Sequence, residues 1–127
     1  MTTATRAASV VLQSSDLMRL RWHALPGATR VNVKILSMSD GEIAGLLLVE
    51  PDGEVQTHVH EGGDHHMYVL EGRCWFGGNL LVEGAYVRVP AHTPHSLLGA
   101  GPSGCRLLYV ATGGALVPPA ATAMSFT

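Results

Sequence analysis

The feature that most constrains the fold is the close spacing of glycine-containing turn sequences along an otherwise apolar chain. Of the 127 residues, 15 are glycine and 7 are proline, while 46% are hydrophobic and only 14% are charged. Short runs of alternating or apolar residues, such as 30–37 and 43–50, lie between these turns and are typical of β-strands. The pattern predicts roughly eight or nine short strands, almost no helix and an all-β sandwich or barrel.

Two turn sequences carry much of this interpretation. Pro51-Asp52-Gly53 and the stretch from Gly99 to Gly104 contain the residues that favour tight turns, and each is expected to end one strand and begin the next. The strands are expected at residues 30–37, 43–50, 55–60, 65–71, 73–76, 80–82, 86–89, 95–98 and 105–111.

The length of the chain fits a single domain with one core. We expect residues 20–112 to form the barrel and residues 1–19 to be an N-terminal leader or an edge strand, in which Ser15-Asp16 could cap one helical turn. Residues 113–127 are expected to be a flexible tail. Because an open barrel exposes edge strands, a homodimer is also expected.

Charge and cysteine usage exclude several classes of partner. The formal net charge of -2 gives neither a basic field for nucleic acid nor a polybasic segment for a membrane surface. No apolar stretch approaches the roughly 20 residues that span a bilayer, and no secretory signal pattern begins the chain. Cys74 and Cys105 lack C-x-x-C spacing, so a cytoplasmic protein with reduced thiols is predicted.

The chemistry is concentrated in the histidines. His58 and His60 are two residues apart and should share one face of an extended strand. The turn at 61–64 then reverses the chain, which allows His65 to face the same interior, and His95 follows the rigid turn at 90–94. Neutral imidazoles suit zinc, iron, nickel or copper, so a divalent metal site is predicted.

These histidines carry a resemblance to the cupin superfamily. Its first motif is matched by Gly53, His58, His60, His65 and Gly72, and its second by Gly84, Pro90, His92 in place of glycine, and His95. The resemblance spans about residues 20 to 112. It implies a single-domain cupin, that is, a double-stranded β-helix or jelly-roll barrel, with one divalent metal held by His58, His60, His65 and His95.

The main departure from the family is His65, because most metal-binding cupins carry glutamate at that position. Four neutral ligands leave the metal's charge uncompensated, which favours zinc, iron or nickel over manganese and favours an anionic enolate or phenolate as substrate. Gln56 is expected on the face of His58, as an additional ligand or as a hydrogen bonder beside the site. His92 is a candidate acid or base at the rim, so His92 and Gln56 are the candidate catalytic residues.

Other residues near the predicted site are weaker candidates. Glu61 and Asp64 are placed to hydrogen-bond the outer imidazole nitrogens, and His66 should point away from the site by alternation. The aromatic side chains are either pocket walls or ordinary core, and they are Tyr68, Trp75, Phe76 and Tyr86.

Three functions remain open because cupin barrels host many activities. The stretch from Trp22 through Leu36 resembles small cupins that cleave diketones or hydroxylated aryl ketones with Fe(II) and dioxygen. A Gln56 ligand would instead resemble the zinc-dependent Lewis-acid cyclases of aromatic polyketide pathways. The segment 84–96 and the following Gly104-Cys105 also resemble the cupin domain of zinc-dependent anti-sigma factors, which leaves a non-catalytic ligand-binding or sensor cupin as the third possibility. A metal-dependent enzyme with a small-molecule substrate, dioxygenase-like, is the leading prediction.

Overall fold

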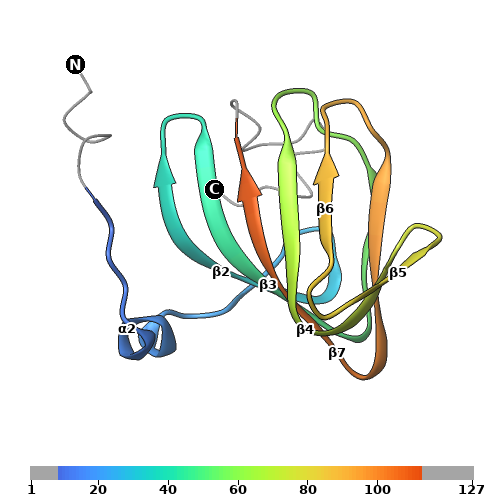
Figure 1. The fold of residues 1–127 in the computed structure, drawn as a ribbon, viewed down its shortest axis with the longest axis horizontal. Helices are drawn as coiled ribbons and strands as arrows, with labels where there is room; N and C mark the ends of the chain where they lie inside the picture. Colours follow the sequence, from blue (N-terminus) through green and yellow to red (C-terminus); the bar gives the residue numbers. More distant parts are fainter. Residues whose placement is uncertain (1–8, 113–127) are drawn as a thin grey trace.

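The described part of the chain, residues 9–112 of a computed structural model, is built almost entirely of strands (Figure 1). One short helix, α2 (Ser14–Arg19), precedes them. The strands are β1 (His23–Ala24), β2 (Thr29–Ser39), β3 (Glu42–His58), β4 (His65–Phe76), β5 (Asn79–Val82), β6 (Tyr86–Val89) and β7 (His95–Ala111). The prediction of an all-β domain with almost no helix is confirmed. The tail expected at 113–127 lies outside the described residues.

The N-terminal part, residues 9–22, contains the helix and no strand. Asp16 accepts a hydrogen bond at 2.9 Å from the backbone N–H of Gln13, which caps the first turn of α2. The helix is tied to β2 by Lys34, whose buried ammonium group donates to the Leu17 carbonyl at 2.9 Å and lies 4.6 Å from the Trp22 ring centroid. No helix among residues 9–112 has the length and hydropathy that a membrane-crossing segment needs.

The strands form one antiparallel sheet in the order β1-β2-β3-β7-β4-β5, and β6 pairs with β4 (Figure 1). Strand β7 is central because it pairs with β3 on one side and with β4 on the other. The buried side chains of these strands form one apolar core, in which Val49, Val69 and Leu107 are almost completely inaccessible to solvent. A single core agrees with the expectation of one domain.

Three strands are longer than the sequence predicts, because β3, β4 and β7 each join two expected strands into one. The Pro51-Asp52-Gly53 sequence and the Gly99 to Gly104 stretch do not end strands. They lie at shifts of pairing register inside β3 and β7, and a matching shift follows Gly72 in β4. The prediction of turns at these two places is therefore wrong.

The irregular points of the three strands lie against one another and bend the sheet. Gly72 and Gly104 both have positive φ angles, 81° and 66°. A Cβ atom on Gly72 would lie 2.0 Å from the Gly104 carbonyl oxygen, and one on Gly104 would lie 2.0 Å from the Val49 carbonyl oxygen. A bend of this kind needs the same small, left-handed residues as a reversal of the chain, so the sequence cannot distinguish the two.

Candidate metal centre

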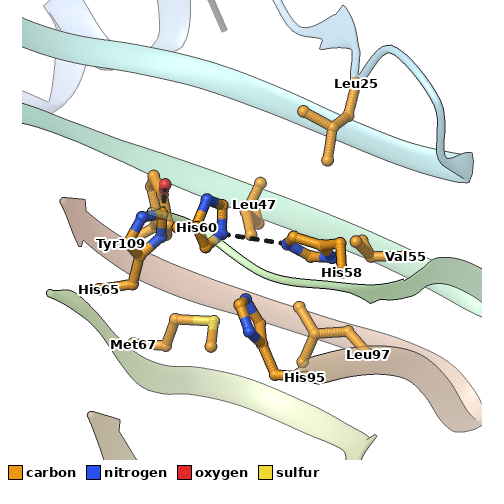
Figure 2. A pocket seen from close by; sticks show the side chains of 10 residues that line it. All are labelled: Leu25, Leu47, Val55, His58, His60, His65, Met67, His95, Leu97 and Tyr109. Atoms are coloured by element: carbon orange, nitrogen blue, oxygen red, sulfur yellow. Dashed lines mark hydrogen bonds between the residues drawn. The ribbon is translucent and has the colours of Figure 1, made fainter. Parts of the chain in front are cut away.

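The ends of three strands bring the predicted histidines together (Figure 2). His58 is the last residue of β3 and is the direct pairing partner of His95, the first residue of β7. His65 begins β4, and His60 follows β3 in the irregular segment between the two strands. All four side chains line one cavity, so the topology places histidines that are up to 37 positions apart side by side.

Three of these side chains form a compact group of nitrogen donors. Ligand atoms of His58, His60 and His95 all lie within 4.8 Å of one another. The Nε2 atoms of His58 and His60 are 3.1 Å apart, which the dashed line in Figure 2 marks. Two nitrogens at about 2.1 Å from one metal and at a right angle to each other would be about 3.0 Å apart. The spacing therefore fits two neighbouring ligands of one divalent ion.

Backbone carbonyl groups orient two of the rings. Nδ1 of His58 donates to the Gln56 carbonyl at 2.8 Å, and Nδ1 of His95 donates to the Thr93 carbonyl at 2.9 Å. A carbonyl oxygen only accepts, so each ring carries its proton on Nδ1 and leaves a lone pair on Nε2. This is the tautomer that a metal ligand needs.

The protonation of His60 follows from its contact with His58. Because Nε2 of His58 holds a lone pair, Nε2 of His60 is the donor in the 3.1 Å contact. Nδ1 of His60 is then an acceptor, and it is buried without a hydrogen-bond partner among the described residues. The proton between the two Nε2 atoms of His58 and His60 thus lies where a cation bound by both nitrogens would lie.

Burial and the neighbouring imidazoles lower the pKa values of two histidines of the group, His60 and His95. Burial, followed by the nearby charges of His65, His58 and His95, lowers the pKa of His60 from 6.5 to about 3. Burial also lowers the pKa of His95; its hydrogen bond to Thr93 acts in the opposite direction, and the nearby His58 has a smaller lowering effect. No carboxylate lines the cavity in the described part of the chain, so the available donors carry no negative charge.

His65 lies beside the group of three. Its ring stacks on the ring of His60, with centroids 3.6 Å apart and an angle of 23° between the planes. Its Nδ1 is 2.9 Å from the hydroxyl oxygen of Tyr109. His66 points away, as expected, and its Nδ1 is 2.6 Å from the hydroxyl oxygen of Tyr86.

Gln56 does not lie where the sequence places it. Its side chain is exposed and is not part of the cavity lining, whereas Val55 is buried and lines it. A register shift between Val55 and His58 interrupts the alternation along β3, so Gln56 and His58 no longer share a face. Its contribution to the site is the backbone carbonyl that orients His58.

His92 is exposed, and its backbone supports the site. Its φ angle is 64°, which explains why this position of the cupin motif is ordinarily glycine. The backbone N–H of His92 donates to the His60 carbonyl at 2.7 Å, which joins the turn before β7 to the segment carrying His60. The side chain is outside the cavity lining.

The remaining candidates are mostly outside the cavity. Glu61 is exposed and Asp64 pairs with Arg88 at 2.8 Å, and neither residue is part of the cavity lining. Tyr68, Trp75 and Tyr86 are exposed, whereas Phe76 is partly buried and its ring lies 6.2 Å from that of His95.

Sequence reasoning missed the rest of the lining. The cavity has a volume of about 30 Å³, room for an ion with a water molecule. Apolar side chains surround the histidines, and they are Leu25, Leu47, Val55, Met67 and Leu97 (Figure 2). Tyr109 completes the lining. The alternation of Leu107, Tyr109 and Ala111 at the end of β7 was the signal that could have revealed it.

Comparison with known proteins gives the same fold. The family model of the ChrR cupin-like domain matches residues 10–114. No curated protein sequence matches the chain significantly. Solved structures do match: the polyketide cyclase RemF from Streptomyces resistomycificus has a TM-score of 0.70 and 23% identity, and the match covers 80% of each chain.

Two further structures show how widely this fold is used. The anti-sigma protein ChrR, solved with SigE of Rhodobacter sphaeroides, has a TM-score of 0.64 and 24% identity over 75% of this chain and 50% of ChrR. A predicted oxalate decarboxylase from Thermotoga maritima has a TM-score of 0.68 and 19% identity over 81% of this chain and 98% of its own. At these identities the likeness establishes the fold alone, a single-domain jelly-roll barrel.

Proposed function

Because this chain belongs to the ChrR cupin-like family, we propose that it holds one divalent transition metal through His58, His60, His65 and His95. We propose further that it is an enzyme acting on a small enolisable or phenolic substrate, bound as an anion. The observation that supports the metal site best is the convergence of His58, His60 and His95, two of them with the lone pair of Nε2 left available by backbone carbonyls.

The charge of the site supports an anionic substrate. The lining contains histidines, apolar side chains and one phenol, and the two histidine pKa values that burial lowers keep those rings uncharged at neutral pH. A divalent cation among such donors keeps its full charge, which an enolate or phenolate oxygen would balance. Leu25, Leu47 and Leu97 line this space with apolar groups, and an apolar lining strengthens such an attraction.

The position of Gln56 favours two vacant coordination positions. Four imidazole ligands would leave two places of an octahedron open, and Gln56, whose side chain is exposed and outside the cavity lining, would not fill either of them. When bound, the metal would supply Lewis acidity and, if it were iron, oxygen activation as well. Two vacancies suit a substrate that presents two oxygen atoms, as a diketone enolate does. Dioxygenase-like cleavage of a diketone or hydroxylated aryl ketone is therefore our first candidate reaction.

The second candidate is Lewis-acid cyclisation of a polyketide with zinc. It is favoured by the likeness to RemF, which is described as a polyketide cyclase. The third candidate is ligand binding without turnover, and it is favoured by the likeness to the anti-sigma protein ChrR.

Metal content and oxygen uptake distinguish these functions. Protein purified without a histidine tag should contain about one zinc, iron or nickel per chain by elemental analysis. The iron-loaded protein should consume oxygen in proportion to the loss of a 1,3-diketone such as acetylacetone. A chain that contains zinc and consumes no oxygen with any diketone would contradict the dioxygenase, and one that retains no transition metal would contradict the proposed site.

The expected homodimer is also part of this proposal. Leu80, Trp75 and Leu98 are direct pairing partners across β5, β4 and β7, and all three are exposed. They form an apolar row that a second copy would cover. Light scattering should give twice the chain mass at micromolar concentration, and Trp75→Glu should shift it toward the monomer. A wild-type monomer at that concentration would rule the dimer out.

A further inference from the structure

Among the described residues that line the cavity, Tyr109 is the one that contacts a histidine through a hydroxyl group. Its hydroxyl oxygen lies 2.9 Å from Nδ1 of His65, and the two rings meet edge to face with centroids 5.3 Å apart. Both residues sit on paired strands, since Tyr109 of β7 faces Met67 of β4, two positions from His65. The sheet therefore holds this contact in place, with both side chains buried.

The hydrogen-bond partner of His65 differs in chemistry from the partners of His58 and His95. His58 and His95 face carbonyl oxygens, which accept only, so their tautomer is fixed with the proton on Nδ1. A phenol can accept or donate. When the Tyr109 hydroxyl accepts, His65 carries its proton on Nδ1 and its Nε2 holds a lone pair. When the hydroxyl donates, the proton of His65 is on Nε2, and the ring cannot bind a metal through that atom.

The arrangement of the rings agrees with this difference. Ligand atoms of His58, His60 and His95 lie within 4.8 Å of one another, while His65 stacks on His60 outside that group. Backbone carbonyl groups thus orient two rings of the group of three, whereas His65 is in contact with the hydroxyl group of a side chain.

We propose that Tyr109 is the positioning residue that makes His65 a metal ligand, an inference that rests on the metal site proposed above. By accepting the Nδ1 proton of His65, its hydroxyl holds the ring in the tautomer with a lone pair on Nε2. Tyr109 thereby sets the number of imidazoles at the metal to four, and with it the number of coordination positions left for substrate at two. Without the hydroxyl, three imidazoles remain.

The test uses Tyr109→Phe, which removes the hydroxyl and keeps the ring. X-ray absorption of the cobalt-loaded protein should count four imidazoles in the wild type and three in the variant, and cobalt affinity should fall about tenfold. His65→Ala should give the same three-imidazole spectrum, and the double variant should lose no more affinity than either single variant. Tyr68→Phe, the same change at an exposed position, should leave the spectrum unchanged.

A second measurement needs no metal. In the metal-free protein, Tyr109→Phe should change the imidazole ¹⁵N chemical shifts of His65 and leave those of His58 and His95 at values for a protonated Nδ1. Four imidazoles in the cobalt-loaded variant, or unchanged ¹⁵N shifts of His65, would overturn the inference. A wild-type protein that binds cobalt through three imidazoles would overturn it and leave metal binding intact. A wild-type protein that binds no cobalt would refute both proposals.

Discussion

Replacing His60 with alanine is expected to weaken metal binding about 100-fold. A site with four ligands binds its metal with a free energy of about 10–16 kcal/mol, so the loss of one ligand removes about 3 kcal/mol. His60 is the histidine whose ring lies nearest the centre of the group. Its ring centroid is 4.7 Å from that of His58, 3.6 Å from that of His65 and 5.0 Å from that of His95. Titration with zinc or cobalt against a competing chelator measures the affinity directly.

Two other histidines provide matched controls for this variant. His23 is exposed in β1, and His66 follows His65 but contacts Tyr86 instead of the cavity. Alanine at either position should leave the affinity within a factor of about two, since neither side chain reaches the donors. Circular dichroism of the metal-free His60→Ala protein should show the wild-type strand content. An affinity equal to that of the wild type would refute the proposed ligand set.

The metal-free protein is expected to lose stability as the pH falls from about 7.5 to about 4, with His60 contributing about 3 kcal/mol of the loss. The unfolded chain takes up a proton on this residue near its ordinary pKa of 6.5, whereas the folded chain does so only near pKa 3. Between these values the unfolded state binds more protons, so the free energy of unfolding decreases with decreasing pH. Above about pH 6.5 the contribution is fully present. The lowered pKa of His95 acts in the same direction.

Urea unfolding after chelator treatment measures this effect at each pH. The control is His60→Gln, a neutral side chain that does not titrate in this range and so removes the histidine contribution while other groups still titrate. The wild type should therefore lose about 3 kcal/mol more than the variant over the same range. Equal losses in the two proteins would show that His60 titrates normally in the folded state. Added zinc should raise the stability at neutral pH and have less effect at pH 4, because protons and metal compete for the same nitrogens.

Part of the candidate site could be predicted from the sequence. The spacing of His58 and His60, the turn before His65 and the prolines before His95 led to four histidines around one cavity, and the structure places all four in its lining. Alternation failed for Gln56 because a register shift in β3 adds a residue between Val55 and His58. Such a shift depends on the pairing of β3 with β7, which cannot be seen in the local sequence of β3.

The sequence by itself determined the class of the fold and the absence of a carboxylate from the predicted donors. Glycine spacing indicated strands, and a histidine at position 65 where the family has glutamate indicated a donor set made of imidazoles, because both follow from residue type alone. Tertiary structure alone decided whether Pro51-Asp52-Gly53 ends a strand or bends it, since the answer lies in the contact of Gly104 with the Val49 carbonyl. It also decided that Tyr109 meets His65. These two residues are 44 positions apart, and only the pairing of β4 with β7 brings the phenol of Tyr109 to Nδ1 of His65.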